Sequence, residues 1–341
     1  MMSKPVNSPT LPRNQKLAST YQIRRTLSVS ELSIIYVARH MEQGTLHVIK
    51  EFFPATLARR SRDRCTVECS GSHLQAKFAD MMKTFRQEGE ILSKIDHPGI
   101  VRYESEFEQH GTCYLVLQYY RGMTLDRYIR EHPEELDAQF LQRRLFPVID
   151  ALEYIHNLGY IHRDVKPSNI MLTEDGRTLL LDFGSAVRYE QRTHPILTTA
   201  GYSPIEFYSG RSVQGPVSDI YSLAATFYFC CRGKAPIDVP KRLFNDTLEK
   251  LGTNEVASPI MARMIHWGLA VSADKRCASL KWFKIAMQAE RFWNRNLVLT
   301  RGKKGKRTST AVQPSSSELA GAEEVAKHKA NEAETAEYSL K

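Results

Sequence analysis

A ten-residue stretch near the middle of the chain, Tyr160–Asn169, reads YIHRDVKPSN and constrains the fold more than any other segment. It places an acid, a cation and an amide at short fixed offsets, at Asp164, Lys166 and Asn169. The acid can accept a proton from an incoming hydroxyl, the cation can neutralise charge growing on a phosphoryl group, and the amide can offer a carbonyl oxygen to a metal ion. The stretch therefore predicts a loop suited to phosphate chemistry, whose partners come from elsewhere in the chain.

The composition is that of an ordinary soluble globular protein. The chain has 341 residues, of which 42% are hydrophobic and 25% charged, enough for one large domain or two moderate ones. The formal net charge is +9, and one local basic cluster lies within residues 301–307. A run of this kind is explained better by a solvated linker than by a nucleic-acid site, so nucleic acid is not expected as a partner.

Cysteine usage and hydropathy bear on the compartment. Six cysteines in a chain of this length, with no signal-peptide pattern in residues 1–25, predict reduced thiols and a cytoplasmic location. Cys65 and Cys69 could pair or share a metal, but no second pair stands at zinc-finger spacing, so we expect inert thiols. The longest apolar run, residues 220–231, is too short to span a bilayer, and no membrane association is expected.

The first part of the chain reads as strands. Residues 1–20 mix prolines with polar residues and predict a flexible N-terminal arm. Residues 21–27 (YQIRRTL), 33–40 (SIIYVARH) and 45–53 (TLHVIKEFF) follow, with a turn at Gly44, and predict an antiparallel sheet. An arginine-rich excursion over residues 54–79 separates them from the next element.

Helical periodicity dominates most of the rest. Apolar residues recur at helical spacing from Phe78 to Ile95 and again over residues 141–158. Residues 170–186 interrupt the helices with two short strands that lead into Asp182-Phe183-Gly184. A buried helix is predicted from Asp219, and residues 293–341 predict a basic linker followed by a disordered or weakly helical tail.

Taken as an ordered set, these segments resemble the eukaryotic-type protein kinases. The HRDxxxxN catalytic loop corresponds to residues 162–169, the strand lysine to VIK ending at Lys50, and the metal-binding DFG to residues 182–184. The runs IKEFFP and GYSPIEFY look most like bacterial Hanks-type serine/threonine kinases. The resemblance implies an α+β, two-lobed fold, with a small lobe of antiparallel sheet plus one helix at about 21–118 and a larger, mainly helical lobe at about 122–292.

The resemblance also implies roles for individual residues. Catalysis would rest on Asp164, Lys166, Asn169, Lys50 and Glu88, the last of which pairs with Lys50. Asn169 and Asp182 would bind Mg²⁺. With Leu117 as gatekeeper and a hinge at residues 118–120, the residues implied in ATP binding are Leu27, Ser28, Ser30, Ser33, Ile35, Val48, Lys50, Gln118, Tyr120, Met171 and Asp182.

One segment departs from the family pattern. Where the family carries three glycines in its phosphate loop, this chain has Ser28, Ser30 and Ser33. Glycine permits positive φ and a close approach of backbone N–H groups to phosphates, so serine there predicts weaker nucleotide binding. A pseudokinase scaffold or nucleotide sensor therefore remains the alternative to an active enzyme.

The segment from Gly184 to Glu206 resembles the activation and substrate-binding segments of these kinases. Thr199 corresponds to the threonine that faces the substrate hydroxyl, and phosphorylation is expected at Thr193, Thr198 or nearby residues. Arg276 is expected to pair with Glu206 in a buried ion pair. The implied activity is ATP-dependent phosphorylation of serine and threonine in proteins, including the kinase itself, with protein substrates and a cognate phosphatase as partners.

Overall fold

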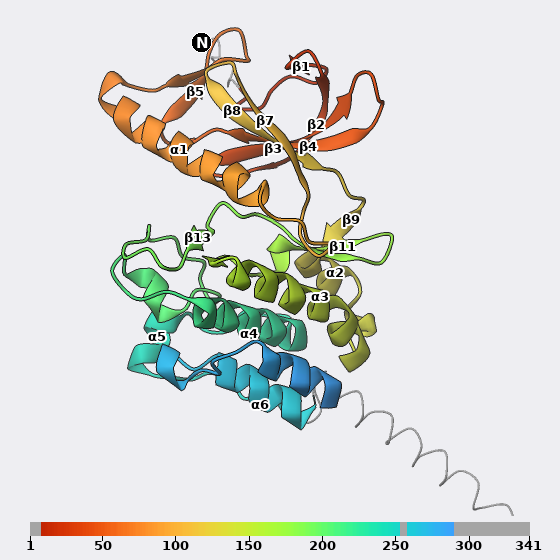
Figure 1. The fold of residues 1–341 in the computed structure, drawn as a ribbon, viewed down its shortest axis with the longest axis vertical. Coiled ribbons are helices and arrows are strands. Elements are labelled where there is room, and N and C mark those ends of the chain that lie inside the picture. The colour runs from red at the N-terminus through yellow and green to blue at the C-terminus, as the bar shows by residue number, and fades with distance from the viewer. Residues whose placement is uncertain (1–7, 253–257, 290–341) are drawn as a thin grey trace, which may run out of the picture. The chain divides into compact units, whose positions relative to one another are not determined.

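The structure is a computed structural model, which describes residues 8–252 and 258–289. Its first lobe is an antiparallel sheet with the strand order β1-β2-β3-β4-β8-β7 (Figure 1). Successive side chains along a strand point to opposite faces of the sheet, so each face has its own set of buried side chains. The strands are β1 (Lys16–Leu17), β2 (Tyr21–Val29), β3 (Ser33–His40), β4 (Leu46–Phe52), β7 (Tyr103–Gln109) and β8 (Thr112–Gln118).

A single long helix, α1 (Gln75–Leu92), packs against this sheet. Its buried residues Phe78 and Phe85 meet the ring of Phe52 on β4, with ring centroids 5.2 and 5.5 Å apart. These spacings are typical of aromatic contacts in protein cores. The contact fixes α1 against the centre of the sheet, next to Lys50.

One expectation for this lobe is wrong. Residues 8–20 are not a free arm, because Leu11 and Leu17 are buried and β1 pairs with β2 as the edge of the sheet. Residues 1–7 lie outside the described residues. Within the arginine-rich excursion, β5 (Ala58–Arg60) and β6 (Val67–Cys69) form a hairpin. Burial of Arg60 beside an acidic partner explains why so polar a segment orders.

The second lobe is mainly helical. Its labelled helices are α2 (Leu125–Glu131), α3 (Ala138–Asn157), α4 (Pro216–Arg232), α5 (Val239–Phe244) and α6 (Pro259–Gly268), and residues 281–289 are helical as well. Short strands accompany them, namely β9 (Gly122–Thr124), β10 (Tyr160–Ile161), β11 (Ile170–Thr173), β12 (Thr178–Leu180) and β13 (Val187–Arg188). Short 3-10 turns occur at Ser72–Leu74, Pro133–Glu135, Pro167–Asn169, Ile205–Tyr208 and Ala273–Lys275.

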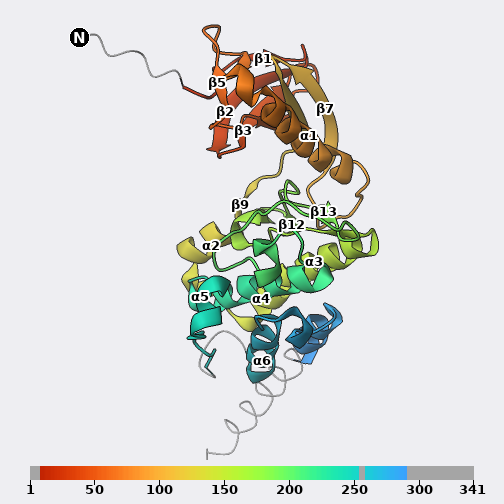
Figure 2. The same cartoon turned by 90° about the vertical axis from the view of Figure 1, so that its left-hand side faces the viewer.

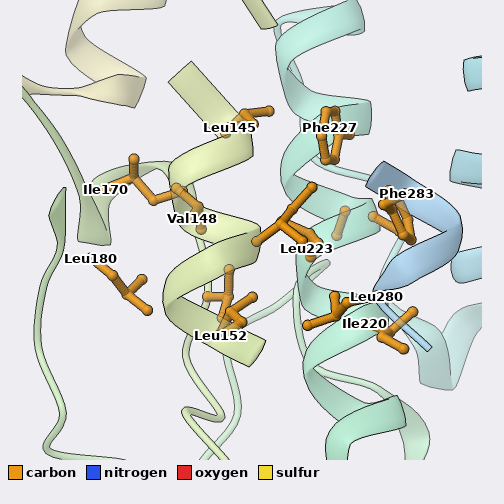
Figure 3. Close-up of a cluster of buried hydrophobic side chains, with 14 of the residues drawn as sticks. Leu145, Val148, Leu152, Ile170, Leu180, Ile220, Leu223, Phe227, Leu280 and Phe283 are labelled. Carbon is orange, nitrogen blue, oxygen red and sulfur yellow. The ribbon is translucent and has the colours of Figure 1, made fainter. Parts of the chain in front are cut away.

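Helix α4 forms the centre of this lobe. It begins with Pro216 in its first turn and ends at Arg232. The capping residue that follows, Gly233, has a φ of 68°, the left-handed conformation that glycine adopts readily at a helix C-terminus. Figure 3 shows Leu223 of α4 facing Val148 and Leu152 of α3, while Phe227 lies beside Phe283. The buried run on α4 thus continues the core from α3 to the helix that follows residue 280.

The core consists of two hydrophobic clusters, and the larger one extends from the helical lobe into the sheet lobe through Ile91 and Leu92 of α1 and Leu117 of β8. Beyond the connection between β8 and β9, the segment after α1 contacts β12, where Leu180 N donates to Gly99 O and Val101 N donates to Leu180 O. Figure 2 shows the sheet and α1 gathered apart from helices α2–α6. The expected two-lobed α+β fold is confirmed. In the described part of the chain no helix is both long and apolar enough to cross a membrane.

Candidate active site

Three charged residues from distant parts of the chain meet at one point. The Nζ of Lys50, on β4, lies 2.9 and 2.7 Å from the two carboxylate oxygens of Glu88 on α1. It also lies 2.7 Å from Oδ1 of Asp182, which follows β12 in the second lobe. The predicted pairing of Lys50 with Glu88 is therefore present, and Lys50 in addition links the two lobes.

The electrostatics of this cluster favour charged groups. Burial opposes the charge of Lys50, but the carboxylates of Asp182 and Glu88 outweigh it and raise the lysine pKa. Lys50 in turn lowers the pKa of Asp182 from 3.8 to about 2. Burial raises the pKa of Glu88, and the contact with Lys50 opposes that shift. The cluster thus holds a cation between two anions.

Strand register places an apolar surface around Lys50. Ile35 on β3 and Leu115 on β8 are its direct partners across the sheet, and Val48 pairs with Leu117 one step along the same face. Because alternate residues of a strand share a face, these side chains surround the lysine. Such a surface suits an apolar ring held next to charged phosphates.

The catalytic-loop residues form a second cluster. One oxygen of Asp164 accepts the Thr199 hydroxyl at 2.9 Å, and the other lies 2.8 Å from the Nζ of Lys166. The side-chain amide of Asn169 donates to both the carboxylate and the backbone oxygen of Asp164, at 2.8 and 2.9 Å. A carboxylate with a hydroxyl on one side and an ammonium on the other is the arrangement that proton removal and phosphoryl stabilisation require.

A buried aspartate on α4 holds this loop in place. The two oxygens of Asp219 accept the backbone N–H groups of His162 and Arg163, each at 2.8 Å. Burial disfavours the charge of Asp219, but its hydrogen bond from His156 and the loop amides lower its pKa. Arg163 has a φ of 67° and Asp182 a φ of 59°, conformations that non-glycine residues adopt only when their surroundings impose them.

Comparison with known proteins agrees with this geometry. A family model described as protein kinase domain matches residues 31–286. The chain belongs to the protein kinase family.

Individual relatives give the extent of the match. Sperm motility kinase 2A of Mus musculus is 30% identical over 211 residues, which is 60% of this chain and 39% of that protein. CBL-interacting serine/threonine-protein kinase 8 of Arabidopsis thaliana is 27% identical over 222 residues, or 64% of this chain and 45% of the relative. The match thus spans less than half the length of these curated relatives.

A solved structure called "PpkA-294 apo form" resembles the kinase domain over most of its length. The TM-score is 0.73 and the identity 28%, and the match covers 82% of this chain and 100% of that one. Sequence and structure therefore agree that the chain has a protein kinase fold.

The serines of the kinase phosphate loop close a tight hairpin between β2 and β3. Ser30 N donates to Ser33 O at 2.9 Å, and Ser33 N donates to the Ser30 hydroxyl at 3.1 Å. None of Ser28, Ser30 and Ser33 has positive φ. The backbone carbonyls of the turn are hydrogen-bonded as well. The carbonyl of Glu31 accepts the N–H of residue 55, and that of Leu32 accepts the N–H of residue 53. Serine is therefore accommodated in this hairpin without backbone strain.

The residues expected in nucleotide binding do not all present side chains to Lys50. Ser33 is buried at the start of β3, and Ile35 and Val48 lie on the lysine face. Gln118 pairs with His47, so its side chain shares the opposite face, and the Tyr120 hydroxyl donates to it at 2.8 Å. The predicted contacts of Gln118 and Tyr120 with ATP would therefore be made by their backbone groups. Leu27, on β2, is 42% exposed, and Met171, on β11, is half-buried.

The two predicted metal ligands have oxygen atoms to offer. The amide nitrogen of Asn169 is used by Asp164, which leaves its carbonyl oxygen as the ligand atom. Asp182 engages Lys50 through Oδ1, and its side chain is 45% exposed. A Cβ on Gly184 would lie 3.3 Å from oxygens of both Asp182 and Glu88, so glycine keeps this place open. The donor set fits a hard cation such as Mg²⁺.

Arg163 and Arg276 hold the segment that follows Gly184 in place. The Arg163 guanidinium is buried, donates to Pro195 O at 2.5 Å and lies 5.1 Å from the Phe207 ring centre. The predicted ion pair between Arg276 and Glu206 is confirmed, with hydrogen bonds of 2.6 and 3.0 Å. This pair holds the turn Ile205–Tyr208 next to α4.

Two residues near the site carry roles that sequence reasoning did not assign. His162 is fully buried, its Nε2 lies 3.0 Å from Leu181 O, and its ring meets Phe183 edge-on at 4.8 Å. The contact ties the catalytic loop to the DFG segment. The sequence signal for both residues was their place in a motif, because His162 precedes Asp164 by two residues and Phe183 follows Asp182 directly.

Proposed function

We propose that this chain is an ATP-dependent protein kinase that phosphorylates serine and threonine hydroxyls on proteins, including itself. The observation that carries the proposal is the arrangement at Asp164, whose carboxylate holds the Thr199 hydroxyl on one side and Lys166 on the other. An acceptor hydroxyl that takes a place beside this carboxylate would be oriented for attack and would lose its proton to it.

Each remaining residue has a part in the proposed transfer. Asp164 receives the proton of the acceptor hydroxyl. At the same time the hydroxyl oxygen bonds to the terminal phosphorus of ATP, and the bond from that phosphorus to the leaving ADP oxygen breaks. Lys166 stabilises the charge on the transferring group. Lys50, held by Glu88, binds the inner phosphates. Mg²⁺, held by Asn169 and Asp182, supplies charge neutralisation at the phosphates when bound.

The finer assignments are proposals as well. The IKEFFP and GYSPIEFY runs support the bacterial Hanks-type branch. The presence of six cysteines that form no disulfide supports a reducing, cytoplasmic compartment. Thr193 and Thr198 are exposed on the segment before Thr199, which supports self-phosphorylation there and a cognate phosphatase as a partner.

A pseudokinase role is the second candidate, and the serine hairpin is the observation behind it. Two features weigh against it. The charged residues expected for catalysis are all present and joined by short contacts. The serine hairpin itself is unstrained. Catalysis depends on charge placement more than on the exact shape of the loop.

The test is transfer of labelled phosphate from Mg·ATP to the chain itself and to a generic acceptor protein. Asp164→Asn is expected to lower the rate by about 10²- to 10⁴-fold, the usual contribution of a general base. Asp175→Asn, which alters an exposed aspartate paired with Arg177, is the matched control and should keep its rate. The labelled residues should be serine and threonine. Equal labelling by wild type and Asp164→Asn, or label on tyrosine alone, would contradict the proposed activity.

A further inference from the structure

A fully buried carboxylate lies directly beside Lys50 in the sequence. Glu51 follows it on β4, and because successive strand residues point to opposite faces, it lies on the side of the sheet away from Glu88 and Asp182. Its two oxygens accept four hydrogen bonds. Tyr36 and Tyr114 each donate one at 2.8 Å, and Arg60 donates two at 2.7 Å.

The tyrosines belong to the strands on either side of β4. Tyr36 is on β3, and Tyr114 is the direct partner of Glu51 on β8. Burial, reinforced by the charge of Glu51, raises the pKa of both phenols, so both stay protonated and act as donors. Glu51 therefore fastens β4 to both neighbours at the residue next to the lysine.

Arg60 extends the network to two further segments. Its guanidinium donates to Pro9 O and Cys65 O as well as to Glu51, and it stacks 4.9 Å from the Phe53 ring centre. The side chains of Arg60 and Glu51 are 1% and 0% exposed. The N-terminal segment joins through Leu11, whose N–H donates to the Tyr36 hydroxyl at 3.0 Å.

None of these groups touches the cluster of Lys50, Glu88 and Asp182 directly, yet the network determines where β4 lies. Lys50 reaches two carboxylates in two different elements with contacts of 2.7 to 2.9 Å. Such contacts tolerate little movement of the strand that carries the lysine. A strand held from both sides, one residue away, keeps that position.

We propose that Glu51, held by Tyr36, Tyr114 and Arg60, is a positioning residue that sets Lys50 for the nucleotide phosphates from the opposite face of the sheet. This inference rests on the proposed kinase function. It makes the N-terminal segment around Leu11 and the β5–β6 hairpin part of the support of the nucleotide site.

The experiment measures the dissociation constant of Mg·ATP by titration calorimetry, with no acceptor present. Tyr36→Phe removes one hydroxyl donor from Glu51 with little change of shape. We expect it to weaken Mg·ATP binding about fivefold, the effect of one net hydrogen bond. In a Lys50→Ala background the same substitution should leave the dissociation constant unchanged, because the residue through which it acts is gone.

Tyr128→Phe is the matched control. It also removes a tyrosine hydroxyl that donates to a glutamate, Glu135, but on the exposed surface of the large lobe. It should leave Mg·ATP binding unchanged. Tyr114→Phe is the second test variant, so that the result does not depend on one substitution folding, and cooperative thermal unfolding identifies which variants are folded.

The outcomes separate the two claims. Unchanged Mg·ATP affinity in a folded Tyr36→Phe or Tyr114→Phe variant would overturn the positioning role, as would equal weakening with and without Lys50. Mg·ATP binding needs no turnover, so a wild-type chain that binds Mg·ATP yet transfers no phosphate would sink the proposed activity while the binding cycle still decides the role of Glu51.

Discussion

The ammonium of Lys50 on β4 lies 2.7 Å from the carboxylate of Asp182, although 132 residues separate them in sequence. One residue belongs to the sheet lobe and the other to the helical lobe. The contact joins the two lobes at the point where the phosphates of a nucleotide are expected, and Glu88 completes it from α1.

The pH dependence of this contact follows from the pKa of Asp182. The folded-state pKa is lowered from 3.8 to about 2, so the ionised carboxylate stabilises the fold fully above the unfolded value of 3.8 and progressively less as the pH falls toward 2. We expect the difference in melting temperature between wild type and Asp182→Asn to be constant above about pH 5 and to shrink between pH 4 and 3. A difference that widened with acid would contradict this assignment.

Arg276→Ala should destabilise the large lobe strongly. It leaves the Glu206 carboxylate buried without its partner, which costs about 3 to 5 kcal/mol. Urea unfolding followed by circular dichroism measures the loss. Arg59→Ala serves as the control, since its pair with Glu68 is exposed and contributes about 0 to 1 kcal/mol. Similar losses in the free energy of unfolding in the two variants would show that the buried pair stabilises the fold no more than the exposed one.

Asp219→Asn should impair turnover. An amide at this position can accept through its oxygen, but its NH₂ group faces one of the two backbone N–H groups that the carboxylate now accepts. Loss of a hydrogen bond to a buried charged group costs about 1.5 to 3 kcal/mol. We expect a lower kcat with little change in the KM for ATP, because the substitution disturbs the loop that carries Asp164. Steady-state kinetics with ATP varied tests this, and a rise in KM alone would argue against it.

Restoring glycine in the phosphate loop should not improve nucleotide binding. In Ser30→Gly the hydroxyl that accepts the N–H of Ser33 is lost and the hairpin gains backbone freedom. The expected change is weaker Mg·ATP binding, by about 1 kcal/mol. Ser8→Gly, on the exposed N-terminal segment, controls for the chemical change alone. Tighter binding in Ser30→Gly would instead show that the serine hinders the phosphates.

Much of the site could be predicted from the sequence because its signals are local. Asp164, Lys166 and Asn169 lie on one loop, where their spacing in sequence fixes which groups can point to the same place. The alternation around Lys50 and the helical period around Glu88 likewise predict which face each residue occupies. The packed arrangement agrees with those faces.

Other features depended on packing between distant segments. The N-terminal segment looked flexible because its prolines and polar residues show no period, yet Leu11 is buried against the sheet. The sequence does not distinguish Arg60 from the other arginines of residues 54–79, and only the fold places Glu51 and the carbonyl of Pro9 beside it.

The sequence by itself determined the order of the motifs, the type of most elements and the chemistry that the loop at Asp164 can perform. Only the tertiary structure decided which buried charges meet, how the serine hairpin closes and which groups surround the carboxylate behind the sheet next to Lys50. The physical reason is that motifs and hydrophobic periodicity reflect interactions between residues close in sequence. The partner of a buried polar group instead comes from whichever segment the folded core places beside it.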